Sequence, residues 1–221
     1  MSQIHTVQSA STHTQPANRI RAWWLVLLLL LLVLLATALA VSSFSLSRAP
    51  AEGSPEVNFS RDMATHHAQA VEMALIARDR SSDEELRRFA LDIMLTQQAQ
   101  IGQMQGWLAA WGRPLTGVQP TMQMPGMATQ QQINELVALP VAEMEASFLQ
   151  LMIRHHQGGI MMAEDALRRT KRTEVVQLAQ AIVNSQQSEI DYMQDLLKRR
   201  GVAAPMPTAP MNMDQMETAT P

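Results

Sequence analysis

The stretch FSRDMATHHAQAVEMA, residues 59–74, returns 89 residues later as FLQLMIRHHQGGIMMA, residues 148–163. The match extends without a gap from 59–127 onto 148–216, and it pairs QQAQIGQM with QQSEIDYM in the second half of each copy. Self-similarity at a fixed offset is typical of a tandem duplication. We therefore expect a fold built from two copies of one unit.

Each copy is predicted to form two helices. In the first copy, apolar and small residues recur every three or four positions over about 59–79 and again over about 83–111. This spacing marks one face of a helix in each range. Ser81 or Ser82 is the expected cap of the second helix. The second copy repeats the outline.

Two such hairpins predict an all-α fold, a four-helix bundle over 57–201, because this is the smallest arrangement that buries both pairs of apolar stripes. Gly112 and Gly201 follow the last helix of each copy and are expected to end it. In the link between the copies, a short extra helix is predicted at 129–139, with a capping box that starts at Thr129.

The N-terminal part predicts a membrane segment. An uncharged run of 19 residues at 23–41 is just long enough to cross a bilayer, and two arginines without an acidic residue precede it. The positive-inside rule then keeps 1–22 in the cytoplasm and places the bundle in the periplasm or outside the cell. A signal peptide cleaved near 38–40 is the alternative, and it gives the same compartment. Residues 42–56 are expected to be a flexible linker, and 202–221 a disordered, methionine-rich tail.

The composition restricts the chemistry. The chain has no cysteine, 17 methionines and a net charge of -3. The charge argues against a nucleic-acid partner. Without cysteine there are no disulfides, thiolate metal sites or thiol nucleophiles, so a metal ion would be bound by imidazole, thioether or oxygen.

Histidine and methionine gather at corresponding places in the two copies. Apart from two histidines that precede the apolar run, all histidines lie in two adjacent pairs, each flanked by methionines. Imidazole and thioether without thiolate suit copper, and Cu(I) in particular, by ligand softness. The candidate ligands are His66, His67, Met63, Met73 and Met104 in the first copy and His155, His156, Met152, Met161, Met162 and Met193 in the second.

Helical methionine has a simpler explanation as core filler, since its flexible side chain fits irregular gaps. Adjacent helical residues point about 100° apart, so at least one histidine of each pair is expected on the flank of its helix. The methionines of MQMPGM and MNMDQM lie in proline-rich sequence without a core to fill, which favours metal capture or partner docking there. These residues are Met122, Met124 and Met127, and Met211, Met213 and Met216. The pairs Gln97-Gln98 and Gln186-Gln187 are able to polarise metal ligands, but an interhelical hydrogen bond is the simpler explanation.

Other chemistries find little support. A di-iron bundle uses Glu-x-x-His, which does not occur in the chain, and no serine lies in a glycine-rich elbow. We expect a copper-binding protein of copper homeostasis or tolerance rather than an enzyme, with an envelope copper-handling protein as a partner. A structural or docking module with a methionine-rich core is the alternative, and a copper-dependent redox enzyme is a third hypothesis.

The doubled M-x-x-H-H helix and the downstream Q-x-x-I-x-x-M helix, from about 57 to 200, resemble the domain of unknown function 305 family. The resemblance implies a ferritin-like four-helix bundle, exported or membrane-anchored in bacteria, with copper binding and copper tolerance in some members. It also implies ligands at the two histidine pairs and at Met73, Met104, Met161, Met162 and Met193.

Overall fold

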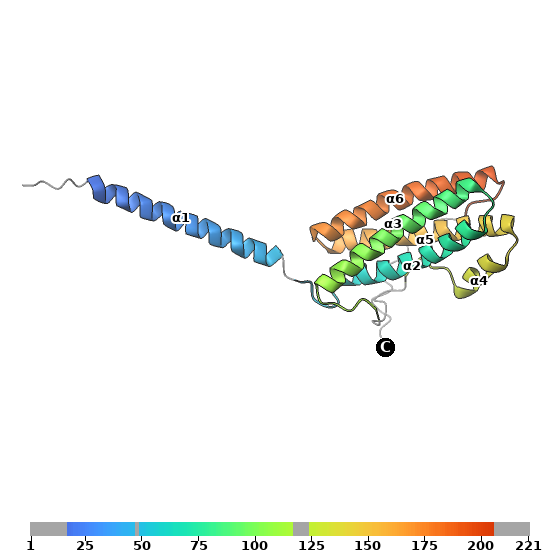
Figure 1. Cartoon of the computed structure of the whole chain (residues 1–221), viewed down its shortest axis with the longest axis horizontal. Helices are drawn as coiled ribbons and strands as arrows, with labels where there is room; N and C mark the ends of the chain where they lie inside the picture. Colours follow the sequence, from blue (N-terminus) through green and yellow to red (C-terminus); the bar gives the residue numbers. More distant parts are fainter. Residues whose placement is uncertain (1–16, 47–48, 117–123, 206–221) are drawn as a thin grey trace, which may run out of the picture. The chain divides into compact units, whose positions relative to one another are not determined.

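The computed structural model describes residues 17–46, 49–116 and 124–205. These residues form six helices and no strand (Figure 1). The predicted all-α class is therefore confirmed. The helices are α1 (Ala17–Leu46), α2 (Pro55–Arg80), α3 (Glu84–Ala110), α4 (Gln130–Ala138), α5 (Val141–Arg169) and α6 (Thr173–Arg199).

The chain divides into two compact units, 1–48 and 49–221. The first unit contains α1, whose side chains are described over 23–39 and are exposed throughout. Where side chains are described, no helix meets the length and hydropathy needed to cross a membrane. The anchor at 23–41 stays a prediction.

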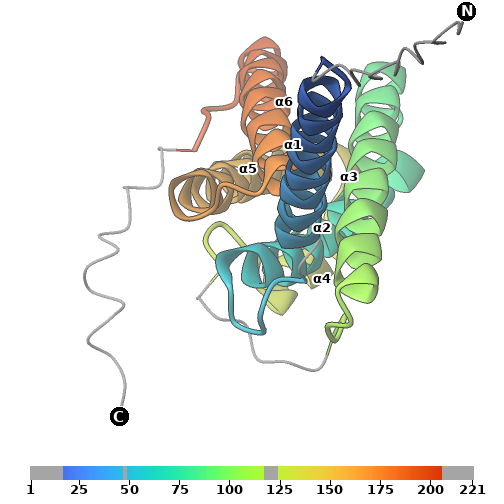
Figure 2. The ribbon, with the colours of Figure 1, turned by 90° about the vertical axis from the view of Figure 1, so that its left-hand side faces the viewer.

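The second unit is a helical bundle made of two hairpins (Figures 1 and 2). In one hairpin α2 packs against α3, and in the other α5 packs against α6. The hairpins meet mainly where α2 packs against α5, and the short α4 lies against both of these helices. Side chains also link the outer helices, because Tyr192 on α6 donates a hydrogen bond to Glu85 on α3 over 2.7 Å.

The helix ends follow local signals, with one correction. Asp83 caps α3 by accepting hydrogen bonds from the amides of Glu85 and Leu86. We expected Ser81 or Ser82 in this role, but Ser81 ends α2 and donates its hydroxyl hydrogen to Glu145. A carboxylate is the stronger acceptor for helix N-terminal amides, which explains the choice of Asp83.

Other boundaries agree with the prediction. Gly112 and Gly201 follow α3 and α6 with φ of 65° and 69°, the left-handed conformation that glycine adopts easily after a helix. The capping box at Thr129 is present at the start of α4. Helix α5 begins at Val141, seven residues before the start of the repeat, because Pro140 both follows α4 and precedes the first turn of α5.

The hydrophobic core consists of two clusters that the duplication relates to each other. One cluster contains Met73, Met152 and Met193, and the other contains Met162, Met63 and Met104. Adding or subtracting 89 converts each trio into the other. In each cluster these methionines come from three helices: two helices belong to one copy of the repeat and the third belongs to the other copy. The two copies therefore complete each other's core, with α2 and α5 running antiparallel.

Candidate metal centre

The two histidine pairs come together where α2 packs against α5. All four rings are fully buried. The ring centroids of His66 and His155 are 3.8 Å apart, His66 and His67 are 6.3 Å apart, and His155 and His156 are 6.4 Å apart. We call these four side chains the histidine cluster. The expectation that one member of each pair faces the flank is wrong, because α3 and α6 cover the second member of each pair.

Three of the rings hold a hydrogen bond at Nε2. His66 Nε2 lies 3.0 Å from the carbonyl oxygen of Pro125, and His67 Nε2 lies 2.7 Å from Oε1 of Gln100. His156 Nε2 lies 2.5 Å from Oε2 of Glu189. Each partner atom is an acceptor, so the imidazole donates and its proton sits on Nε2.

In a neutral ring that tautomer leaves Nδ1 with a lone pair. In the described part of the chain, Nδ1 of His66, His67 and His156 is buried and has no hydrogen-bond partner, and His155 has none at either nitrogen. A metal-binding histidine has the same organisation: one nitrogen donates to an oxygen acceptor and the other faces the metal.

Burial keeps three of the four rings neutral. Desolvation lowers the pKa of His66 to about 4, although the Pro125 carbonyl acts in the opposite direction. Desolvation, together with the neighbouring His66, lowers the pKa of His67 to about 3. The pKa of His155 is also lowered well below its usual value, by burial and by the other three rings. Neutral imidazole is the form that binds metal ions.

Two buried amides lie on the helices that follow the histidine pairs. Gln97 on α3 and Gln186 on α6 are equivalent in the two copies, and neither side-chain amide has a hydrogen-bond partner among the described residues. The interhelical hydrogen bond that we expected for them is therefore wrong. Gln186 occupies the space that a side chain at Gly159 would fill, since a Cβ there would lie 2.4 Å from its Oε1. Unpaired polar atoms at this depth indicate an absent water or ion.

The first methionine-rich segment crosses the cluster. We call residues 124–128 the crossing loop. Its Pro125 carbonyl accepts from His66, and Gln69 forms two hydrogen bonds with the backbone of Ala128, at 2.7 and 2.9 Å. The loop lies directly on α5: a Cβ at Gly158 would be 2.0 Å from the Pro125 oxygen. This close approach holds the crossing loop against α5.

The methionines separate into three groups. Six predicted ligands are buried in the two core clusters, three in each. Met161 is half-buried and belongs to neither cluster. In the crossing loop, Met124 packs against the cluster that contains Met63, and Met127 is half-buried. The remaining tail methionines, Met122, Met211, Met213 and Met216, lie outside the described residues.

Nitrogen and carboxylate ligands alone do not make a complete site. Over the described residues, no three His, Asp or Glu side chains are placed to hold one metal ion. A metal at the histidine cluster would therefore need a thioether, a backbone oxygen or a ring movement to complete its ligand set. The donor atoms that are present, neutral imidazole and buried thioether, fit a soft monovalent cation.

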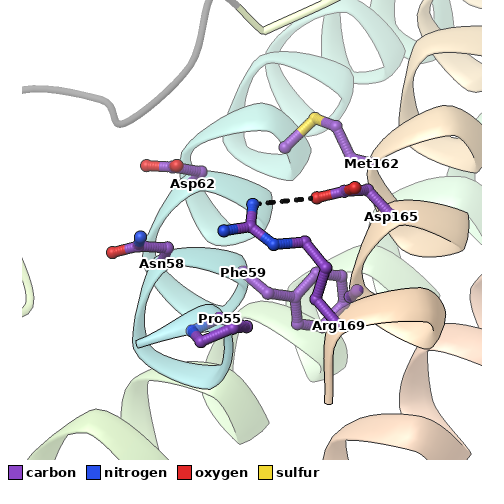
Figure 3. Close-up of a pocket in the computed structure, with 8 residues that line it drawn as sticks. Pro55, Asn58, Phe59, Asp62, Met162, Asp165 and Arg169 are labelled. Carbon is purple, nitrogen blue, oxygen red and sulfur yellow. Dashed lines mark hydrogen bonds and ion pairs between the residues drawn. The ribbon is translucent and has the colours of Figure 1, made fainter. Parts of the chain in front are cut away.

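A small cavity lies elsewhere, between the start of α2 and the end of α5 (Figure 3). Its volume is about 30 Å³, and its lining includes Asp62, Asp165 and Arg169. Arg169 reaches toward Asp165 and pairs with it at 3.4 Å. The space suits about one water molecule, so it does not offer a binding site for an organic substrate.

Sequence reasoning missed three partners of the histidines: Pro125, Gln100 and Glu189. Two of them had a detectable signal, because Gln100 and Glu189 are equivalent polar positions on the helix that follows each histidine pair. Both lie 33 residues after the histidine that they contact. Pro125 had no such signal, since the contact depends on how the link folds back.

Comparisons with known proteins agree with this architecture. The model of the family "Domain of unknown function (DUF305)" matches residues 56–197. A DUF305 protein from Streptomyces coelicolor, presumed to be secreted, is 44% identical with a TM-score of 0.68, and the match covers 70% of this chain and 99% of that one. A DUF305 fragment from Deinococcus radiodurans is 39% identical with a TM-score of 0.60, covering 66% and 96%.

The protein CopM in its Cu(I)-bound form is 28% identical with a TM-score of 0.56, and the match covers 65% of this chain and 96% of CopM. CopM structures with Ag and with Cu(II) are similar to this chain to about the same extent. A comparison with curated proteins gives no match.

Proposed function

This chain belongs to the DUF305 family, and from that premise we propose that its bundle binds copper, as Cu(I), in a copper-handling role outside the cytoplasm. The observation that carries the proposal is the histidine cluster, in which three buried rings place Nε2 against an oxygen acceptor and all four Nδ1 atoms are buried without a partner among the described residues. Buried polar atoms without partners are uncommon in proteins, and here they gather on ligand-type side chains.

The methionines support the choice of metal. Each core cluster contains three of the predicted thioether ligands, on the helices that carry or follow the histidine pairs. Thioether with imidazole favours Cu(I) over hard divalent cations. The similar protein CopM is known in Cu(I)-bound and Ag-bound forms, and both are soft monovalent cations.

In this proposal, His66, His67, His155 and His156 supply nitrogen through Nδ1, and the two methionine trios supply sulfur. Gln100, Glu189 and the Pro125 carbonyl fix the rings by accepting from Nε2. Surrounding hydrocarbon excludes water, which limits exchange of the bound ion and its access to oxidants. The methionines of 122–127 and 211–216 capture or hand over Cu(I).

The cellular location of the bundle is part of the proposal. The uncharged run at 23–41 anchors the chain in a membrane with 1–22 in the cytoplasm, and the bundle acts in the periplasm or outside the cell. A similar DUF305 protein that is presumed to be secreted supports the compartment. In this location an envelope protein that carries or exports copper is the expected partner.

The test is an anaerobic titration of the purified full chain with Cu(I) in competition with a chromogenic chelator. We expect at least one equivalent of Cu(I) to bind, and we expect replacement of all four cluster histidines by Gln to remove the tightly bound equivalent. Since that variant removes buried rings, its circular dichroism must match the parent. Less than one equivalent for the native chain would reject the proposal.

One observation favours the alternative of a structural module: six of the predicted methionine ligands are buried among hydrocarbon side chains, as core residues are. Met104→Leu and Met193→Leu separate the two roles, because leucine fills a similar volume without a thioether. A ligand role predicts weaker Cu(I) binding in the variants, and a core role predicts unchanged binding. We propose that the protein binds copper and does not catalyse a reaction. Turnover of the copper-loaded chain in an oxygen-consumption assay would contradict this proposal.

A further inference from the structure

The two outer histidines of the cluster have different partners. His67 donates to the neutral amide of Gln100, whereas His156 donates to the carboxylate of Glu189. From this we infer that the cluster has two unequal ends, and that a soft cation binds first at the His156 end, where Glu189 is the positioning and charge-compensating residue. The inference rests on the proposed function and adds which half of the duplication binds the ion first.

The two copies of the repeat allow a direct comparison of the two histidine partners. Gln100 and Glu189 occupy the same position of the repeat, each on the second helix of its hairpin. Both contacts are made by Nε2 of a fully buried ring, and both partners are partly exposed. The geometry is thus shared, and the charge of the partner is the main difference between the ends.

The negative charge of Glu189 matters because the histidine rings are buried away from water. A cation that enters a buried site loses its hydration, and a nearby negative charge offsets part of this cost. A carboxylate that accepts from a histidine also makes the opposite nitrogen a more basic ligand, and removal of such a partner typically weakens metal binding about 10- to 100-fold. An amide fixes the ring orientation equally well but carries no charge.

A second observation points to the same end. The crossing loop engages Nε2 of His66, which belongs to the first copy, and leaves only Nδ1 unpartnered there. His155, its equivalent in the second copy, has no partner at either nitrogen among the described residues. The second copy therefore offers three unpartnered nitrogens, and the first copy offers two.

The asymmetry of the loop also has a cause in the sequence. Gly158 lets the Pro125 carbonyl approach α5, and the equivalent residue of the first copy is Gln69. A backbone placed symmetrically on α2 would meet the side chain of Gln69, which already binds Ala128. The crossing loop can therefore dock on α5 as observed.

The experiment uses the full chain labelled with ¹⁵N at histidine. Long-range ¹H–¹⁵N spectra of the metal-free protein report the tautomers, and we expect His67 and His156 both to carry the proton on Nε2. Ag(I) is then added below one equivalent as a diamagnetic probe. We expect the ring signals of His155 and His156 to change before those of His67.

Three variants make the inference sharp. Glu189→Gln keeps a hydrogen-bond acceptor but removes the charge, so we expect the tighter Cu(I) affinity to fall about 10- to 100-fold. The double variant Gln100→Glu/Glu189→Gln moves the charge to the other end, and we expect it to restore tight binding with His67 responding first. Glu164→Gln, an exposed position on α5, removes the same charge elsewhere and should leave affinity and order unchanged.

The outcomes separate the two claims. If native chain binds Cu(I) tightly but Glu189→Gln changes neither affinity nor order, or the double variant keeps the native order, the inference is wrong and the proposed function stands. If the native chain binds neither Cu(I) nor Ag(I), the proposed function fails and the inference fails with it.

Discussion

Mild acid should destabilise the metal-free bundle. The structure buries His66 and His67 and lowers their pKa values to about 4 and about 3, whereas an unfolded imidazole has a pKa of about 6.5. Between these values the unfolded chain binds more protons than the folded chain. The free energy of unfolding therefore falls as the pH falls below about 6.5, and it is fully retained above that value.

The magnitude can be worked out for a change from pH 7 to pH 5. At pH 5 both folded rings are still neutral, while each unfolded ring is about 1.5 pH units below its pKa. At about 1.4 kcal/mol for each pH unit, this amounts to about 2 kcal/mol for each ring and about 4 kcal/mol for both. The lowered pKa of His155 acts in the same direction. Such a loss is large against the usual stability of about 5 to 15 kcal/mol.

The assay is urea unfolding of the metal-free chain at pH 7 and pH 5, followed by circular dichroism. This pH range lies above the titration of ordinary carboxyl groups, so it isolates the histidines. His67→Gln keeps a polar group in place but does not titrate, and it should remove about 2 kcal/mol of the pH dependence. Equal free energies of unfolding at the two pH values would refute the argument that burial keeps these rings neutral.

Three further changes test the packing around the cluster. Gly158→Ala should destabilise the bundle by about 1 to 3 kcal/mol, because its Cβ would meet the Pro125 carbonyl at 2.0 Å. In the control variant Gly106→Ala, on α3, the new Cβ meets nothing within 4 Å, and the bundle should be stabilised by about 0.5 to 1 kcal/mol. Equal thermal shifts in the two variants would contradict the crossing-loop contact. Asp83→Ala should cost about 1 to 2 kcal/mol in urea unfolding through loss of the α3 cap, with Asp83→Asn close to native, and equal losses in both would argue against capping. Met193→Leu should change stability by less than about 1.5 kcal/mol while weakening Cu(I) binding in the chelator assay, and a large stability loss with unchanged binding would make this methionine a core residue alone.

The duplication made most of the fold predictable. Apolar spacing in two registered copies fixes two hairpins, and the glycines at 112 and 201 end helices for a simple conformational reason. The start of α5 was harder to predict from the sequence, since it depends on how Pro140 joins α4 to α5 rather than on the repeat. The spacing of apolar residues does not decide which of several adjacent polar residues caps α3, so Asp83 could not be identified as the cap in this way.

The site was predictable in its residue types but not in its arrangement. Helical geometry alone places one member of each histidine pair on a flank, and only packing by α3 and α6 shows why His67 and His156 are buried. The contact of Pro125 with His66 depends on a chain reversal over 59 residues. The exchange of methionines between the two copies requires knowledge that α2 and α5 run antiparallel.

The most direct measurement of the central claim is X-ray absorption at the copper edge for the full chain loaded with one equivalent of Cu(I). We predict a first shell that contains both imidazole nitrogen and thioether sulfur, with the imidazole part lost in the variant that replaces all four cluster histidines. A first shell without imidazole in the native chain, or one that is unchanged in the variant, would contradict copper binding at the histidine cluster.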